Sequence, residues 1–173
     1  KAFEAGEVVK VPETCERDMY LSAIELLKGA GYLHYEVSNF ALPGNISKHN
    51  SAYWKRQAYI GLGAGAHSSS FGDNTERWWN ENEIEGYMRS VEERGSARAA
   101  GEELSREAEK LEAVYLGLRV LKGIDIGAFR TRFGADPREL LSKAALGREF
   151  LTTDDRGMLK LTQKGLLFSD SLF

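Results

Sequence analysis

The stretch Tyr32–Phe40, YLHYEVSNF, constrains the fold of this chain most, because its side chains alternate in character at almost every position. Leu33, Tyr35 and Val37 alternate with polar or charged side chains, a period typical of a β-strand with one apolar and one polar face. A helix is predicted just before it, over about 13–29, with Pro12 at its start and glycines after its end. A helix followed by a two-faced strand indicates an α/β fold.

The segments up to residue 104 alternate between loops and short elements. Residues 41–50 are expected to form a loop, AYIGLGAGAH (58–67) a short strand that runs into a flexible turn, and Gly72-Asp73-Asn74 the turn of a hairpin. A helix is expected over about 81–94, ended by a glycine. The small and charged stretch GSARAAGEEL (95–104) is typical of a linker, so we place a domain boundary near residue 100.

From Ser105 to the end, the sequence shows a different pattern of expected helices and strands. A helix capped by Ser105 is expected to run to Gly123, and short helices to begin at Asp125 and Pro137. A strand-turn-strand pattern and a last helix capped by Thr162 follow. This order is winged-helix-like. We therefore expect two units, residues 1–98 and residues 100–173.

Composition and charge exclude several classes of protein. The net charge of −3 gives no general attraction to phosphate, and the expected helix over 137–149 carries charges of both signs, so no nucleic-acid partner is expected. No apolar run is long enough for a membrane span. Cys15 is the only cysteine of the 173 residues, which excludes a disulfide framework and fits a reducing cytoplasm.

The candidate binding residues lie close together in HNSAYW. His49, Asn50, Tyr53 and Trp54 place an imidazole and an amide beside two large rings, which could line a slot for a planar aromatic ligand. The alternative is that the rings are core residues and the imidazole fastens the loop by hydrogen bonds. No catalytic residue is assigned.

Three other features have weaker claims to a function. His34 and His67 lack a second ligand at the spacing of a metal site. Glu36 is either a buried acid or ligand-binding group, or else part of a solvated strand face or of a salt bridge to Lys or Arg. The glycines of GLGAGA (61–66) do not fit a nucleotide loop, and they would let the backbone approach another chain segment or a planar ligand closely.

Together, GYLHYEVSNFALPG, SKHNSAYW and YIGLGAGAHS resemble consecutive signatures of the oxygen-independent coproporphyrinogen III oxidase-like family, part of the radical S-adenosylmethionine superfamily. LTQKGLLFSD is similar to the end of that family's C-terminal domain. The H-N-x-x-Y-W pattern resembles the HemW subgroup, which are haem chaperones. The resemblance implies the last part of a partial TIM-type barrel, followed by the winged-helix-like domain.

The resemblance also implies cofactors and site residues. The parent protein would bind S-adenosylmethionine and a [4Fe-4S] cluster, whose C-x-x-x-C-x-x-C loop lies outside this sequence. Ala41 would contact the S-adenosylmethionine, and His49, Asn50, Tyr53 and Trp54 would bind haem, with His49 as the ligand to its iron. This chain alone is expected to have no radical activity, because a single cysteine cannot hold the cluster.

Three functions are therefore open at the level of the sequence. The first is haem binding and delivery to a haem-receiving protein. The second is oxidative decarboxylation of coproporphyrinogen III by the parent protein. The third is a winged-helix regulatory module. The H-N-x-x-Y-W pattern favours the first over the second, and the mixed charge of 136–149 disfavours the third.

Overall fold

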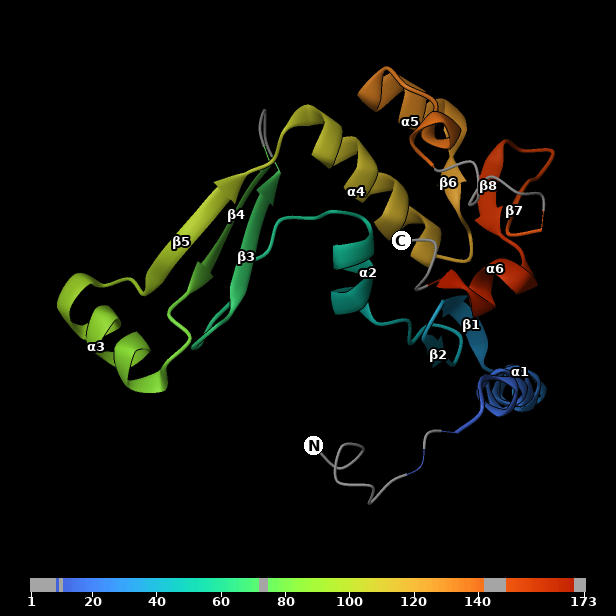
Figure 1. Ribbon diagram of the computed structural model, residues 1–173, viewed down its shortest axis with the longest axis horizontal. Helices are drawn as coiled ribbons and strands as arrows, with labels where there is room; N and C mark the ends of the chain where they lie inside the picture. The colour runs from blue at the N-terminus through green and yellow to red at the C-terminus, as the bar shows by residue number, and fades with distance from the viewer. Residues whose placement is uncertain (1–8, 10, 72–74, 142–148, 170–173) are drawn as a thin grey trace.

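Helix α1 (Glu13–Gly29) leads into strand β1 (Leu33–Glu36), so the strand predicted over Tyr32–Phe40 is present only in its first half. We analysed a computed structural model that describes residues 9, 11–71, 75–141 and 149–169 (Figure 1). The Tyr20 hydroxyl of α1 donates a hydrogen bond of 2.7 Å to the carbonyl of Val37, just after β1. Strand β2 (Asn39–Ala41) returns antiparallel to β1. Helix α1 is therefore fastened to a two-stranded hairpin.

Helix α2 (Lys48–Trp54) follows a loop and occupies the middle of the molecule (Figure 1). The loop expected over 41–50 thus ends at Ser47, whose hydroxyl caps the helix by accepting a 3.2 Å hydrogen bond from the amide of Asn50. A serine at this position satisfies an amide that the first helical turn leaves unpaired.

Strands β3 (His67–Phe71), β4 (Thr75–Asn80) and β5 (Arg98–Glu103) form an antiparallel sheet in that order. Helix α3 (Ile84–Arg94) connects β4 to β5 at the far left of Figure 1 and ends at Gly95, as predicted. The predicted hairpin of β3 and β4 is confirmed, although its turn, residues 72–74, lies outside the described residues.

Two predictions in this region are wrong. The stretch 95–104 is no linker, because its residues 98–103 form β5 and pair with β4. Gly101 makes this pairing possible, since a Cβ there would lie 2.8 Å from the carbonyl oxygen of Arg77. Residues 58–66 form no strand beyond the single bridge from Tyr59 to Ser69, because Gly63 and Gly65 have φ of +108° and +67°, which bend the chain away from an extended course.

The C-terminal part has the predicted order of elements. Helix α4 (Arg106–Arg119) is followed by β6 (Ile124–Asp125), α5 (Ile126–Phe133) and the 3₁₀ helix η1 (Pro137–Leu140), then by β7 (Leu151–Thr153), β8 (Met158–Leu161) and α6 (Gln163–Leu167). The strands form a sheet in the order β6-β8-β7.

The predicted caps of this part are confirmed. Side-chain oxygens of Ser105, Asp125 and Thr162 accept hydrogen bonds from amides in the first turns of α4, α5 and α6. Helix α4 ends four residues earlier than expected. Of the helix expected over 137–149, the structure has η1 at the start, and residues 142–148 lie outside the described residues.

The main apolar core belongs to this C-terminal part. Its members come from α4, α5, the sheet and the residue after η1, and all are buried: Val114, Leu118, Ile124, Ile126, Phe129, Phe133, Leu141, Leu151 and Leu159. Helix α4 supplies the centre of this core, since Val114 and Leu118 are almost completely enclosed. Four residues apart, these two lie on one face of the helix.

The end of α4 pairs with the end of β1. The amide of Val37 donates to the carbonyl of Arg119 (2.9 Å), and the amide of Leu121 donates to the carbonyl of Tyr35 (3.1 Å). This pairing explains why α4 stops at Arg119, because the next residues are extended alongside β1. The chain is thus α/β, and the residues that the structure describes form three separate sheets, none of which closes into a barrel. The division into 1–98 and 100–173 stays a prediction.

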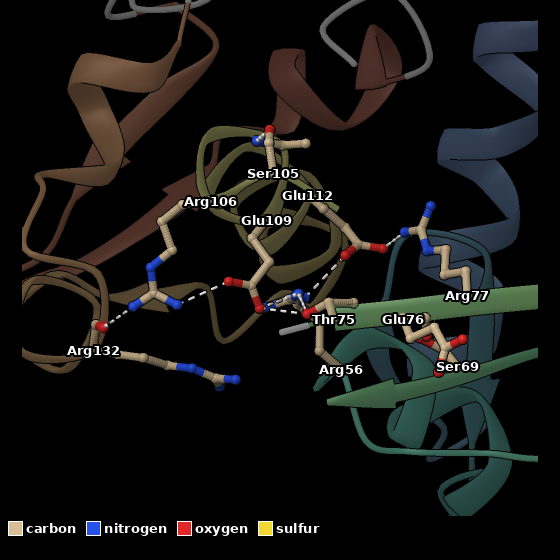
Figure 2. Close-up of polar contacts among 11 residues, drawn as sticks. Arg56, Ser69, Thr75, Glu76, Arg77, Ser105, Arg106, Glu109, Glu112 and Arg132 are labelled. Atoms are coloured by element: carbon tan, nitrogen blue, oxygen red, sulfur yellow. Dashed lines mark hydrogen bonds and ion pairs between the residues drawn. The ribbon is translucent and has the colours of Figure 1, made fainter. Parts of the chain in front are cut away.

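A buried arginine joins α2, β4 and α4 (Figure 2). Arg56, which is 5% exposed, donates hydrogen bonds to Glu112 (3.0 Å), Glu109 (3.1 Å) and the hydroxyl of Thr75 (3.1 Å). The hydroxyl of Thr75 donates in turn to Glu109. A buried guanidinium is therefore neutralised by two carboxylates on successive turns of α4.

Two more arginines complete this network at its edges. Arg106 donates to the second oxygen of Glu109 (2.9 Å), and Arg77 of β4 forms an ion pair with Glu112. Burial raises the pKa of Glu109, but hydrogen bonds from Thr75, Arg56 and Arg106 outweigh it and hold the pKa below its usual value. The carboxylate therefore stays charged at neutral pH.

We predict that Arg56→Met lowers the free energy of unfolding by about 3 kcal/mol, because Glu109 and Glu112 lose their shared buried partner. The control is Arg17→Met, which removes an exposed ion pair with Asp18 and should change stability by less than about 0.5 kcal/mol. Urea unfolding followed by circular dichroism measures both. Equal effects of the two substitutions would contradict the role assigned to Arg56.

A second prediction concerns the acid sensitivity of the C-terminal part. Hydrogen bonds from Arg138 lower the pKa of the buried Asp136 most, and Arg130 adds to this effect against the opposing effect of burial. A carboxyl whose pKa is lower in the folded state stabilises the fold above its unfolded pKa of about 3.9, and this contribution disappears as the pH falls towards the folded pKa.

Asp136→Asn should therefore reduce stability at pH 7 and make stability fall less steeply between pH 5 and pH 2. Thermal unfolding of both proteins across that range measures the two slopes. Parallel curves would show that Asp136 is not responsible for the acid sensitivity.

Candidate functional site

Helix α2 arranges the four candidate residues as two pairs. Side chains four residues apart lie on one helical face, so His49 stands beside Tyr53, and Asn50 beside Trp54. The two faces are about 100° apart around the helix axis. The four side chains thus do not line one continuous slot.

The first pair is directed to solvent. His49 is exposed, and its ring packs edge-on against Tyr53, with 4.8 Å between ring centroids and planes at 84°. Tyr53 packs in turn against Tyr59, with 4.6 Å between centroids. The imidazole is therefore accessible while its position is restrained by a row of two tyrosines.

Tyr59 is a residue that sequence reasoning did not find. Its place comes from backbone pairing with Ser69 of β3, through hydrogen bonds of 2.9 and 3.0 Å. Burial raises the pKa of its phenol. No local pattern links residue 59 to α2, because the contact depends on how the chain returns along β3.

The second pair faces α4. Trp54 is half-buried, and the guanidinium carbon of Arg119 lies 4.7 Å from the centroid of its ring. The indole nitrogen of Trp54 is buried without a hydrogen-bond partner among the described residues. The side chain of Asn50 is half-buried on the same face. Packing against α4 is thus the main contact of Trp54.

The other two histidines lie apart from α2. His34 stacks on Phe40 of β2, with 4.2 Å between centroids, and burial lowers its pKa. His67 is exposed on β3, and its ring centroid lies 5.7 Å from that of Trp79. Within the described residues, no group of three His, Cys, Asp or Glu side chains could hold a metal ion.

Ala41 ends β2 and is 8% exposed. Ala41 pairs with Leu33 of β1. The next pair, His34 with Phe40, lies on the face of the hairpin that contacts Tyr20 of α1. Because neighbouring residues of a strand point to opposite faces, the methyl group of Ala41 points away from α1. Its contact with S-adenosylmethionine stays a prediction.

Glu36 lies at the end of β1 and is completely buried. Asn39 donates a hydrogen bond to one of its carboxyl oxygens, and the other oxygen has no partner among the described residues. Of the two possibilities that the sequence left open, the structure supports a buried acid and not a solvated strand face.

The glycine-rich segment packs on its own chain. A Cβ at Gly61 would overlap the carbonyl of His67, and the side chain of Asn80 donates to the carbonyls of Gly61 (3.3 Å) and Gly63 (3.0 Å). The amide of Gly61 donates to the hydroxyl of Ser68 (2.9 Å). The predicted close approach is confirmed, and the segment approached is β3.

The C-terminal part matches a known family. The model of the HemN C-terminal domain matches residues 104–168. Heme chaperone HemW from Lactococcus lactis is 34% identical over 90% of this chain and 40% of its own length. Heme chaperone HemW from Bacillus subtilis is 29% identical over 99% of this chain and 45% of its own length. The chain is HemW- and HemN-like.

Two further comparisons agree with this assignment. Radical S-adenosyl methionine domain-containing protein 1, mitochondrial, from Danio rerio is 30% identical over 99% of this chain and 41% of its own length. The solved structure of coproporphyrinogen III oxidase (HemN) from Escherichia coli, titled a radical SAM enzyme, has a TM-score of 0.67 over 90% of this chain and 39% of that chain. At 19% identity, this likeness shows the fold.

The HemW-like chain spans less than half the length of these relatives. Its residues do not fit a [4Fe-4S] cluster, because three thiolates are required and Cys15 is its only cysteine, exposed on α1. None of the helices that the structure describes is long and apolar enough to cross a membrane.

The two faces of α2 predict different effects on stability. His49→Ala should change the free energy of unfolding by less than about 0.5 kcal/mol, because the imidazole is exposed. Trp54→Ala should cost about 2 kcal/mol, because the indole packs on α4. Chemical denaturation of the two variants tests this, and a loss of stability in His49→Ala as large as that in Trp54→Ala would show that the imidazole is structural.

Proposed function

We propose that this chain carries part of the haem-binding surface of a HemW-like haem chaperone, which binds haem and delivers it to a haem-receiving protein. The exposed imidazole of His49, restrained by Tyr53 on a capped helix, is the observation that supports this proposal. Neutral imidazole is a common ligand of haem iron, and tyrosine rings pack well on a macrocycle. Relatives named heme chaperone cover most of the chain.

Each sequence-predicted residue has a role in this proposal. His49 is the ligand to haem iron, and Tyr53 together with Tyr59 forms a wall beside it. Asn50 and Trp54 hold α2 against α4 and border the ligand. Ala41, at the end of β2, contacts S-adenosylmethionine in the full-length protein.

The parent protein is proposed to bind S-adenosylmethionine and a [4Fe-4S] cluster through residues outside this chain. S-adenosylmethionine supplies a radical when the cluster reduces it. The second candidate function, decarboxylation of coproporphyrinogen III, is supported by the likeness to HemN. Within this proposal the protein works in the cytoplasm, in keeping with a single exposed cysteine.

The winged-helix order of the C-terminal part does not by itself support nucleic-acid binding. Arg130 and Arg138 both pair with Asp136, so both guanidiniums are already engaged, and the carboxylate offsets one of their two positive charges. A phosphate backbone would require cations that are free to replace its counterions. We assign this part a packing role beside the ligand surface.

Haemin titration of the full-length protein tests the proposal. Wild-type protein should give a Soret band distinct from free haemin, and His49→Ala should shift or weaken it. His67→Ala is a matched control, since His67 is also exposed but lies on β3. The proposal fails if wild-type protein leaves the haemin spectrum unchanged, or if the two variants behave alike.

A further inference from the structure

The guanidinium of Arg119 is half-buried and held in place, but it lacks an anion among the residues that the structure describes. Arg119, the last residue of α4, is half-buried and stacks on Trp54 at 4.7 Å. Its Nε is buried without a partner, and no ion pair or hydrogen bond to its guanidinium is found in the part of the chain that the structure describes. A buried donor that is left unpaired costs free energy. The arrangement therefore calls for an acceptor.

Other stacked arginines show what is missing. Arg56 lies over Phe71 and is paired with two glutamates. Arg98 lies over Trp78 and is paired with Glu76. Arg106 lies over Phe133 and is paired with Glu109. Each of these three guanidiniums is neutralised by a carboxylate, whereas the fourth, Arg132 over Phe133, has no carboxylate among the described residues but is exposed to solvent. At Arg119 the stacking is present and the carboxylate is not.

Arg119 lies at the border of the candidate site. Arg56, just after α2, contacts Glu109 and Glu112 in the first half of α4, whereas Trp54 contacts Arg119 at its end, so the chain here runs antiparallel to α4. His49 is five residues before Trp54, about 7.5 Å along the axis of α2. The side chains of His49 and Trp54 differ by about 140° in direction around that axis, so a flat ligand on His49 must extend across the N-terminal end of α2 to bring its rim to Arg119.

Resting on the haem-binding function proposed above, we propose that Arg119 binds a propionate carboxylate of the tetrapyrrole that His49 holds. The planar guanidinium presents two parallel N–H groups, which match the two oxygens of a carboxylate. Trp54 is a positioning residue in this arrangement, since its ring fixes the plane of the guanidinium. The propionates are the carboxylates on the rim of haem, and the iron lies at the centre.

The test compares a ligand that has free carboxylates with its ester. Haemin and haemin dimethyl ester are titrated into the full-length protein in the same detergent. Wild-type protein should bind haemin about tenfold more tightly than the ester, and Arg119→Gln should lose about tenfold in affinity for haemin and none for the ester. Arg119→Lys should retain part of this preference.

Arg132→Gln is the matched control. Arg132 also stacks on an aromatic ring, Phe133, at 5.1 Å, but it lies beside Arg106 at the opposite end of α4, about 20 Å away along the helix (Figure 2). It should bind both ligands like the wild type. An equal loss in Arg132→Gln would show a general effect of charge and overturn the proposal, as would an equal loss of both ligands in Arg119→Gln.

Iron-free protoporphyrin and its dimethyl ester separate this proposal from the role of His49. If wild-type protein prefers the free acid and Arg119→Gln does not, Arg119 binds carboxylates even where haemin spectra give no sign of imidazole ligation. If haemin binds through His49 and Arg119→Gln equals the wild type with all four ligands, the Arg119 proposal alone is overturned. Wild-type protein that binds none of them overturns both.

Discussion

The pairing of Arg56 with two glutamates of α4 is the interaction on which the arrangement of this chain depends. The guanidinium follows directly after α2, Thr75 starts β4, and Glu109 and Glu112 lie on α4, so one buried cation fixes three segments that are far apart in the sequence. The apolar core lies mainly within the C-terminal part. The sheet of β3, β4 and β5 is therefore held to the molecule largely through polar contacts at one end.

This constraint also determines what α2 can present. With its last residue, Trp54, packed on Arg119 and Arg56 fixed just beyond it, α2 has the face that carries His49 and Tyr53 left to solvent. The end of α4 is fixed in turn by its pairing with β1. The candidate ligand surface is thus a consequence of how two helices and a strand end are joined.

Local signals account for much of what could be predicted. The capping residues Ser105, Asp125 and Thr162 depend on near neighbours, and the structure has the expected helices there. The alternation in Tyr32–Phe40 predicted a strand correctly only as far as Glu36, because the chain then turns back to form β2. The linker expected over 95–104 failed because its small residues are also suited to a strand that pairs closely with β4. Tyr59, Arg119 and the Arg56 network join segments that no local pattern relates.

The backbone of Arg56 places two opposing demands on one position. Its φ of +53° lies in the left-handed region, which glycine and asparagine adopt most readily, whereas the surrounding carboxylates require a long cationic side chain. A residue that relieves the backbone removes the buried partner that Glu109 and Glu112 share and leaves them only Arg106 and Arg77. Lysine keeps the charge but cannot reproduce the fork of donors. Among the common amino acids, no replacement satisfies both demands, so few substitutions at residue 56 can accumulate in evolution.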